Sequence, residues 1–469
     1  MFPGLTLAYW LTLHGLVTLT AVLVYVITAH VLQQRRHPTA AIAWVLFILL
    51  IPYVALPTFL TFGSRKQARP RGQPLRLAPP APSDPEPEGS WAVQTALALG
   101  QGTPAAFDAL HIHADGSAAL QALWEVINGA QHSIALCTFI IGRDAVGHAL
   151  IERLSAKARA GVRVRLMIDG LGRLMAGSPS MRPLIEAGGQ VTRFVPPLHS
   201  PLKGRSNLRD HRKMLIADSG QATRRLWSGG RNLASEYFEG ESGTHAWHDL
   251  SFDLRGAVVL QAAALFEHDW AFANGRRVEA LHPNVSVDLR PGHGAQLIAS
   301  GPDQFDDTVH ALLITAAYRA RSRIALITPY FVPDTALLMA LCMAARRGVV
   351  VDLLLPARSN HFLSDLARRR ALCTLAAAGG RIWLAPQMLH AKLVVVDEVL
   401  ALAGSANLDS RSLFLNYELM MAFHEPAVVG RFAAWFETEQ ASAQRTLPKR
   451  PGLFGDMADG LVLWLGFQL

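Results

Sequence analysis

The stretch that decides the fold is His211-Arg-Lys213-Met-Leu-Ile-Ala-Asp218, which recurs downstream as His390-Ala-Lys392-Leu-Val-Val-Val-Asp397. Both copies follow the pattern His-x-Lys-x-x-x-x-Asp. The chain of 469 residues has only six lysines, and the two copies use two of them. Because this composition predicts far fewer than one copy by chance, the repeated motif indicates a shared chemical role.

Further blocks recur around the motif in the same order. Ser133-Ile-Ala-Leu-Cys-Thr-Phe-Ile matches Arg323-Ile-Ala-Leu-Ile-Thr-Pro-Tyr-Phe, Gly161-Val-Arg-Val-Arg-Leu matches Gly348-Val-Val-Val-Asp-Leu, and Leu184-Ile-Glu-Ala-Gly-Gly matches Leu375-Ala-Ala-Ala-Gly-Gly. Strand-like apolar runs alternate with helix-like stretches such as 144–160 and 335–347, which is typical of α/β folds. We therefore expect two copies of one α/β fold, at 106–290 and 291–469, which face each other across one site.

The first 62 residues differ from the rest of the chain. Arg35 and Arg36 are their only charged side chains, whereas the whole chain carries 44 Lys+Arg and 36 Asp+Glu. Residues 5–32 and 39–62 are uncharged, and each run exceeds the ~20 residues that a helix needs to cross a bilayer. We predict that 1–62 form a transmembrane hairpin. A cleaved signal peptide fits poorly, since no basic region precedes the first run.

The second apolar run contains Pro52 and Pro57, which would kink or shorten its helix, so a re-entrant hairpin stays open. A buried core hairpin is the remaining alternative. Residues 63–105 begin with a proline-rich stretch and are predicted to form a linker. This linker carries more cations than the loop between the runs: Arg65, Lys66, Arg69, Arg71 and Arg76. The bias predicts that both termini and the catalytic body are cytoplasmic, with these cations against anionic lipid.

Two histidines and two lysines suit phosphodiester chemistry. Residues i and i+2 of a strand share a face, so each His points the same way as the Lys of its motif. Lysine neutralises phosphoryl oxygens, a neutral imidazole can attack phosphorus, and a protonated imidazole can donate to the departing alcohol. Asp218 and Asp397 belong to the motif, but their odd offset from the histidines favours a supporting role. This chemistry requires no metal and no other cofactor.

Small-residue turns with an amide follow both motifs, as Gly-Gly230-Arg-Asn232 and Gly-Ser405-Ala-Asn407. Glycine permits a close approach of the backbone, and an Asn side chain can donate to a phosphate oxygen, although such turns are often only structural. The His-x-His at 111–113 lacks further ligands nearby, so we expect no metal site there. The three cysteines are widely spaced, which predicts no disulfide framework.

This arrangement resembles the phospholipase D superfamily, whose members carry two HxKxxxxD motifs with trailing glycine–asparagine turns. It resembles the bacterial cardiolipin synthases in particular, through the N-terminal hairpin and several further blocks. These blocks are Asn207-Leu-Arg-Asp, Trp247-His-Asp249, Ser300-Gly-Pro-Asp303, Thr328-Pro-Tyr-Phe-Val-Pro-Asp334 and Gly404-Ser-Ala-Asn-Leu-Asp-Ser-Arg-Ser412. The resemblance implies two duplicated phospholipase D-like α/β sandwich halves behind a membrane hairpin.

The resemblance also implies a phosphatidyltransferase of the bacterial inner membrane, which joins two phosphatidylglycerols into cardiolipin and releases glycerol. His211 would attack the first lipid, and His390 would protonate the leaving glycerol, although the residues do not decide which histidine is the nucleophile. The residues expected to bind the phosphate are Lys213, Lys392, Asn232, Asn407 and Ser405. Asp249 and Glu418 are expected to support the histidines. Gly230 departs from the pattern, because many members have Ser there.

The charge of the chain is compatible with more than one kind of partner. The net charge of +8 suits an anionic partner, either phospholipid or nucleic acid. A nuclease would not need 62 membrane residues, and the chain has no basic stripe with interleaved aromatics, so we expect no nucleic-acid partner. A phospholipase D that hydrolyses lipid and a transferase that uses phosphatidylethanolamine as donor stay open, as does the oligomeric state. The apolar segment 460–469 is too short to span a bilayer and would pack on the body or dip into the interface.

Overall fold

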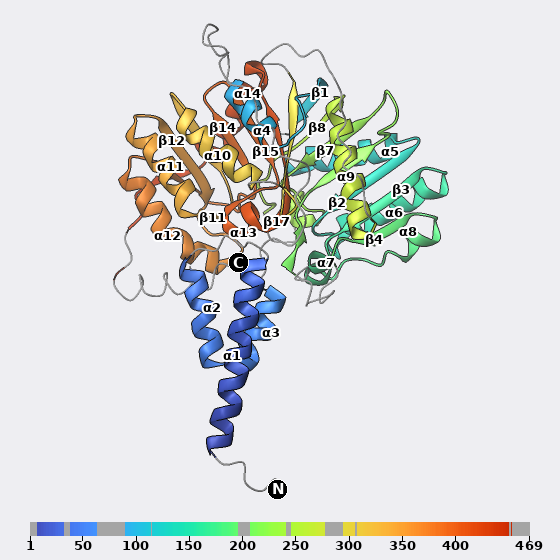
Figure 1. Ribbon diagram of the computed structural model, residues 1–469. Helices are drawn as coiled ribbons and strands as arrows, with labels where there is room; N and C mark the ends of the chain where they lie inside the picture. The colour runs from blue at the N-terminus through green and yellow to red at the C-terminus, as the bar shows by residue number, and fades with distance from the viewer. Residues whose placement is uncertain are drawn as a thin grey trace.

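The computed structural model describes residues 7–31, 38–62, 90–113, 115–195, 207–240, 245–276, 294–304, 307–449 and 452. The proline-rich stretch with its cations, the predicted boundary at 290/291 and the apolar segment 460–469 lie outside these residues. Two α/β halves form the body, and the N-terminal helices project from one side of it (Figure 1).

The first half is built on a seven-stranded mixed sheet with the order β1-β8-β7-β6-β2-β3-β4. Its strands are β1 (Phe107–Ile112), β2 (Ser133–Thr138), β3 (Arg163–Ile168), β4 (Gln190–Arg193), β6 (Met214–Ala217), β7 (Arg225–Gly229) and β8 (Ser251–Gly256). Its helices are α5 (Gly116–Gly129), α6 (Ala145–Arg159), α7 (Gly170–Ala176), α8 (Arg182–Glu186), the short 3₁₀ helix η3 (Ser235–Tyr237) and α9 (Val258–Ala273).

The second half repeats this strand order, as β9-β17-β15-β14-β10-β12-β13, and adds β18 at the far edge. Its strands are β9 (Ala295–Ser300), β10 (Arg323–Ile327), β12 (Val350–Pro356), β13 (Arg381–Ala385), β14 (Leu393–Val396), β15 (Leu400–Gly404), β17 (Asn416–Phe423) and β18 (Gln444–Thr446), with a small separate pair, β11 (Phe331–Val332) and β16 (Leu408–Asp409). Its helices are α10 (Thr308–Arg319), α11 (Thr335–Arg346), α12 (Phe362–Ala377), α13 (Ser410–Phe414) and α14 (Pro426–Ala441). The identical order confirms the predicted duplication.

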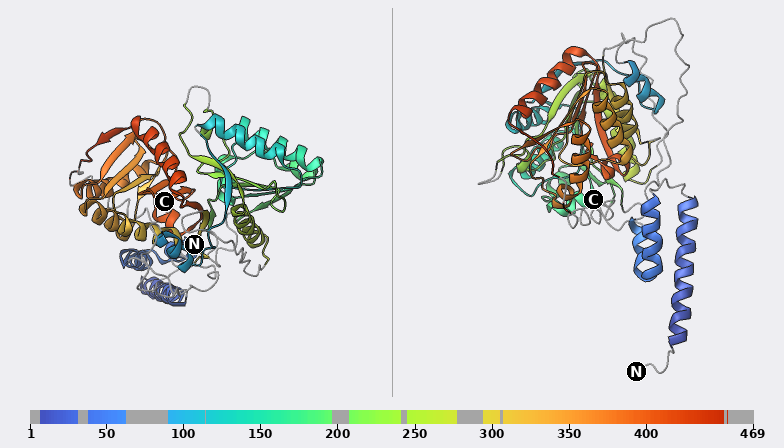
Figure 2. Two further views of the ribbon diagram at one scale, coloured as in Figure 1. Left: turned by 90° about the horizontal axis from the view of Figure 1, so that it is seen from above. Right: turned by 90° about the vertical axis from the view of Figure 1, so that its left-hand side faces the viewer.

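Apolar side chains fill three layers of the body. One core cluster packs α5 and α6 on the outer face of the first sheet, and another packs α10, α11 and α12 on the outer face of the second. The third lies between the two sheets and includes residues of both, together with α9 and α14. Figure 2 shows the two halves side by side. The continuous middle layer makes the two halves one folding unit rather than two tethered domains.

The segment expected to be a linker contains a helix, α4 (Ser90–Ala98). Trp91, Ala92 and Ala96 are buried against the second half, where α4 contacts α10. The buried Gln101 side chain accepts a hydrogen bond from the backbone of Ala299 (2.9 Å). The chain therefore packs on the second half before it enters the first.

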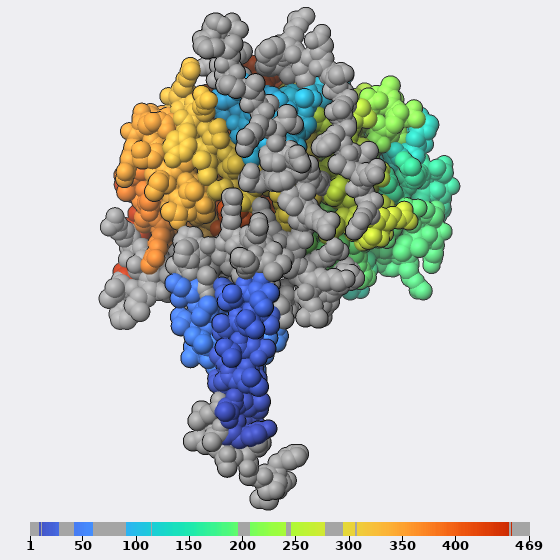
Figure 3. Space-filling view, viewed as in Figure 1, coloured from blue at the N-terminus to red at the C-terminus, as the bar shows by residue number. Residues whose placement is uncertain are grey.

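Three helices form the N-terminal hairpin: α1 (Leu7–Val31), α2 (Pro38–Leu50) and α3 (Pro52–Phe62). The second apolar run is broken at Ile51, directly before Pro52, as the prolines predict. Tyr25 and Phe59 pack with ring centroids 4.9 Å apart, and the hairpin stands clear of the body over most of its length (Figure 3). In the described part of the chain, no helix has both the length and the apolar character needed to cross a membrane.

Candidate active site

The two motifs lie at matching places, at the edge where the parallel strands of each sheet end. Met214 pairs with Cys137 at the end of β2, and Leu393 pairs with Ile327 at the end of β10. The spacing suggested that each His-x-Lys triplet lies within a strand. In the structure, the triplets directly precede β6 and β14 instead. The histidines and lysines of the two motifs thus lie beside the carboxyl ends of β2 and β10.

His211 of the first half is held by a carboxylate of the second. Its Nδ1 lies 3.0 Å from Oε2 of Glu418, which is fully buried on β17. Burial alone would raise the pKa of Glu418, but the His211 and Lys213 charges and the hydrogen bonds outweigh it and hold that pKa below its usual range. Glu418 also accepts hydrogen bonds from Ser405 Oγ (2.6 Å) and Ser412 Oγ (2.6 Å). An ionised Glu418 fixes the His211 tautomer, with Nδ1 protonated and Nε2 free.

His390 of the second half is held in the reciprocal way. Its Nδ1 lies 2.7 Å from Oδ2 of the buried Asp249 in the first half. Burial raises the pKa of Asp249, but His390 and Lys392 outweigh it and hold the pKa below its usual range. Each histidine therefore depends on the opposite half for its carboxylate.

Backbone hydrogen bonds between the halves fix this exchange. The short strand β5 (Arg209–Asp210) leaves the first half and pairs in parallel with β17, so His211 N donates to Tyr417 O (2.9 Å). At the matching place, His248 forms a parallel bridge with Leu389, and His390 N donates to His248 O (2.6 Å). Both histidines are thus positioned by the junction itself.

The lysines of both motifs are buried. Lys213 Nζ donates to His211 O (2.7 Å), and burial lowers the pKa of Lys213 to about 8. Lys392 Nζ donates to His390 O and lies against the His390 ring, 2.8 Å from Nδ1 and 3.1 Å from Nε2, and burial lowers the pKa of Lys392 to about 7. Burial and then Lys392 lower the pKa of His390 to about 3, and burial also lowers the pKa of His211. Burial therefore disfavours the protonated form of both imidazoles in the free protein.

Asp218 and Asp397, expected among the catalytic residues because of the motif, make their contacts elsewhere. Both adopt a left-handed backbone conformation (φ 50°) in the turn after β6 or β14. Asp218 accepts hydrogen bonds from the backbone amides of 131–133, and Asp397 from those of 321–323. Their carboxylates hold the start of β2 and of β10, so the structure gives them a structural role.

The amide turns approach the site with different side chains. Asn232 Nδ2 donates to Tyr237 Oη (2.9 Å), and the Tyr237 ring lies 5.1 Å from that of His390. Asn407 is buried in the second turn. Ser405, expected at the phosphate, instead donates to Glu418. At the matching Gly230, a Cβ would lie 2.2 Å from Asp249 Oδ1, so a side chain there would displace the Asp249 carboxylate.

Arg212 is a residue at this junction that the sequence did not single out. It lies between His211 and Lys213 and is fully buried. Its guanidinium pairs with Asp269 of α9 and donates to the backbone carbonyls of Glu418 (3.1 Å) and Ser300 (3.1 Å). Because it ties the first motif to β17 and β9, Arg212 supports the residue that holds His211. Its partners are remote in sequence, and the matching position, Ala391, offers no parallel, so no local pattern signals it.

Comparison with known proteins places this architecture in a family. A family model described as "Cardiolipin synthase, PLD-like domain" matches residues 123–270 and 313–439, and one described as "Phospholipase_D-nuclease N-terminal" matches 19–64. Cardiolipin synthase A of Klebsiella pneumoniae subsp. pneumoniae is 31% identical over 466 residues, which cover 95% of this chain and 93% of that protein. Cardiolipin synthase A of Escherichia coli O1:K1 / APEC is 31% identical over 472 residues, with the same coverage.

The fold is also found in a solved structure. Phosphatidylserine synthase of Haemophilus influenzae Rd KW20 superposes with a TM-score of 0.60 at 13% identity, over 80% of this chain and 99% of that one. The duplicated halves, the reciprocal histidine–carboxylate pairs and the matches over most of the chain agree. The chain therefore belongs to the cardiolipin synthase family with phospholipase D-like domains.

Proposed function

We propose that this enzyme transfers the phosphatidyl group of one phosphatidylglycerol to the headgroup hydroxyl of a second, which yields cardiolipin and glycerol. The observation that carries the proposal is the reciprocal pairing of His211 with Glu418 and of His390 with Asp249. This pairing sets two imidazoles from different halves beside two buried lysines, which is the set of groups that phosphodiester exchange needs. The relatives named cardiolipin synthase A support the same reaction.

In the first step, Nε2 of neutral His211 attacks the phosphorus of the first lipid. The bond from phosphorus to the headgroup glycerol oxygen breaks, and protonated His390 donates its proton to that oxygen. Glycerol departs, and the phosphatidyl group remains bound to His211 as a phosphatidyl-histidine. Ionised Glu418 accepts the Nδ1 hydrogen bond of His211 and stabilises the positive charge on its ring. We assign the attack to His211 because its side chain is 12% exposed, against 5% for His390.

In the second step, His390 accepts the proton of the headgroup hydroxyl of the second phosphatidylglycerol. The hydroxyl oxygen attacks phosphorus, the bond to His211 breaks, and cardiolipin forms while His390 is protonated again. Lys213 and Lys392 neutralise the phosphoryl oxygens in both steps. Asn407 and the second N–H of the Asn232 amide complete the phosphate site.

The role of His390 as an acid depends on the bound lipid. In the free protein, burial and the Lys392 charge hold the pKa of His390 far below its usual value. A lipid phosphate brings a negative charge that attracts Lys392 Nζ away from His390 Nε2. We propose that this exchange raises the pKa of His390, so that the ring takes up a proton only when a substrate is present.

We infer that the hairpin, residues 1–62, is embedded in the bacterial inner membrane and holds the body at its cytoplasmic face. Its outward surface consists of large apolar side chains, including Leu16 (63% exposed), Leu19 (68%) and Leu50 (74%). Such a continuous apolar surface is unfavourable in water and favourable in lipid. The excess of arginine and lysine after the second run supports the cytoplasmic orientation.

The proposal is tested with the purified full chain in phosphatidylglycerol vesicles that contain a metal chelator. We expect glycerol and a four-chain lipid to form in equal amounts. Accumulation of phosphatidic acid alone would show that the enzyme hydrolyses the lipid rather than transferring its phosphatidyl group. Release of ethanolamine from added phosphatidylethanolamine would identify it as a second donor.

Substitution of each histidine tests the mechanism. His211→Ala and His390→Ala should both lose activity, whereas His148→Ala, on the exposed face of α6, should keep it. After an acid quench, a labelled phosphatidyl group should be attached to the peptide that contains His211. Label on His390 would reverse the two roles, and near-full activity of either catalytic variant would refute the mechanism.

A further inference from the structure

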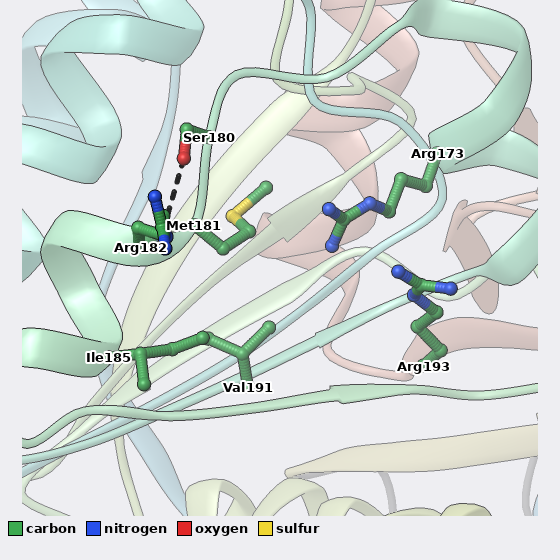
Figure 4. Close-up of a pocket in the computed structure, with 7 residues that line it drawn as sticks. All are labelled: Arg173, Ser180, Met181, Arg182, Ile185, Val191 and Arg193. Atoms are coloured by element: carbon green, nitrogen blue, oxygen red, sulfur yellow. Dashed lines mark hydrogen bonds between the residues drawn. The ribbon is translucent and has the colours of Figure 1, made fainter.

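A pocket beside the catalytic edge of the first half is lined by arginines. It has a volume of about 270 Å³ and lies among α7, α8 and β4. In Figure 4, the guanidinium groups of Arg173 and Arg193 lie near each other on one side of the pocket, and Met181, Ile185 and Val191 supply its apolar lining. Two neighbouring guanidinium groups favour the binding of an anion beside them.

No acidic side chain neutralises this pair within the described part of the chain. The half-buried Arg173 and the exposed Arg182 and Arg193 have no carboxylate partner there, whereas the fully buried Arg212 of the same half pairs with Asp269. Burial is the main cause that lowers the pKa of Arg173, and the nearby charge of Arg193 lowers it further. A bound anion would relieve this repulsion.

Helix α7, which carries Arg173, is joined directly to the catalytic site. The residue that caps its N-terminus, Asp169, accepts hydrogen bonds from Leu171 N and Gly172 N and, through its other oxygen, from the backbone of Asp210 (2.9 Å), next to His211. The start of α7 is therefore tied to the segment that leads into the catalytic His211.

Exposed apolar side chains lie on the same rim of the body. On α7, Leu174 is 68% and Met175 is 62% exposed. At the matching place of the second half, the start of α12 after β12, Phe362 is 75% and Leu363 is 43% exposed. Figure 1 shows α7 and α12 on the side of the body from which the hairpin projects. The two exposed apolar pairs therefore belong to elements on the side of the body that the hairpin leaves.

We propose that this rim is a second membrane contact: Leu174, Met175, Phe362 and Leu363 insert into the lipid interface, and the arginine pocket binds the phosphate of an anionic phospholipid that is not the reacting one. Arginine forks suit a phosphate group, and flanking apolar side chains suit acyl chains at the headgroup boundary. The inference rests on the proposed function only in that the substrates lie in a bilayer. Its consequence is that the catalytic edge is held flat against the lipid surface.

The test uses the full chain in phosphatidylcholine nanodiscs doped with a phosphatidic acid that carries a photoreactive group in its acyl chain. Labelled segments are mapped by mass spectrometry, and a phosphatidylcholine with the same photoreactive chain serves as the neutral probe. We expect both probes to label α7 and the start of α12. We expect the anionic probe to label the segment 173–193 in excess.

Arg173→Gln combined with Arg193→Gln should lower that excess by roughly 25-fold, since one basic residue at an anionic surface contributes about fivefold in affinity. The matched control is Arg159→Gln combined with Arg346→Gln. These two exposed arginines are the last residues of α6 and α11, at the end of the sheets away from the catalytic site. Their substitution should leave the labelling unchanged. Thermal unfolding verifies that both double variants are folded.

Several results would overturn the proposal. Absence of label on α7 and α12 would exclude the membrane contact. Equal labelling by the two probes would exclude the headgroup site, and loss of the anionic excess in inorganic phosphate would identify the ligand as a free anion rather than a lipid. His211→Ala should be labelled like the wild type, so a failure of the catalytic mechanism is distinguished from a failure of this contact.

Discussion

Replacement of Gly230 by alanine tests how far catalysis depends on the pairing of His390 with Asp249. The Gly230 backbone lies outside the left-handed region, so alanine is compatible with it. The added Cβ would lie 2.2 Å from Asp249 Oδ1 and 2.9 Å from its Cγ. Neither the histidines nor the lysines are changed. The perturbation therefore acts through Asp249 alone.

The geometry sets the size of the effect. To reach an allowed contact, Asp249 Oδ1 must move by about 1 Å, which displaces the carboxylate whose Oδ2 holds His390 Nδ1 at 2.7 Å. A catalytic group misplaced by ~1 Å costs about 100-fold in rate, or ~2.7 kcal/mol. We expect kcat of Gly230→Ala to fall by about this factor. KM for phosphatidylglycerol should change little, because Lys213 and Lys392 stay in place.

The assay is the initial rate of glycerol release from phosphatidylglycerol vesicles, measured together with thermal unfolding. Gly129→Ala at the end of α5 is the matched control, since its Cβ would meet no atom within 4 Å. It should keep the wild-type rate. If Gly230→Ala keeps the rate within about threefold and unfolds like the wild type, Asp249 does not position His390 for catalysis and our reasoning is refuted.

Three further predictions concern charge and stability. Glu418→Gln removes the charge that faces His211, and we expect kcat to fall by about 10–100-fold, since a hydrogen bond to a charged group contributes ~1.5–3 kcal/mol; an unchanged kcat would contradict this role. Lys392 and Lys213 lose their protons as pH rises through about 7 and about 8, so kcat/KM, which reports the free enzyme, should fall over that range, and a flat profile would count against both lysines. Asp397→Ala leaves three backbone amides of a turn unpaired, and urea unfolding should show a loss of ~2–4 kcal/mol while the rate per folded molecule is kept; a selective loss of rate would make Asp397 catalytic.

Sequence alone predicts the parts of the site that depend on local spacing. The His-x-Lys triplets are recognisable because both groups lie two residues apart in one motif, and the repeat around them predicts two copies of one fold, which the matching strand order confirms. Asp249 and Glu418 came only from the resemblance, because each pairs with a histidine of the other half. Such pairings depend on how the two sheets are apposed, which no short-range pattern encodes.

The linker region illustrates another limit. Its prolines dominate the composition of 63–105, and the short helix α4 within it was not predicted. The segment Ser90–Ala98 contains good helix formers, and Trp91 with two alanines supplies an apolar face for the second half. Its stability depends on that packing rather than on its own propensity, since an isolated helix of this length is marginal in water.

The reaction needs two imidazoles in opposite protonation states, yet duplication by itself would give both the same surroundings. The structure differs between the halves at the residues behind the histidines. Glu418 is longer than Asp249 and accepts hydrogen bonds from two serine hydroxyls, whereas Asp249 lies against the bare backbone of Gly230. These differences separate the environments of the two rings, and Lys392 at His390 Nε2 increases the separation. The absence of a side chain at Gly230 is therefore part of the asymmetry: a serine there would displace Asp249 instead of supporting it as Ser405 supports Glu418.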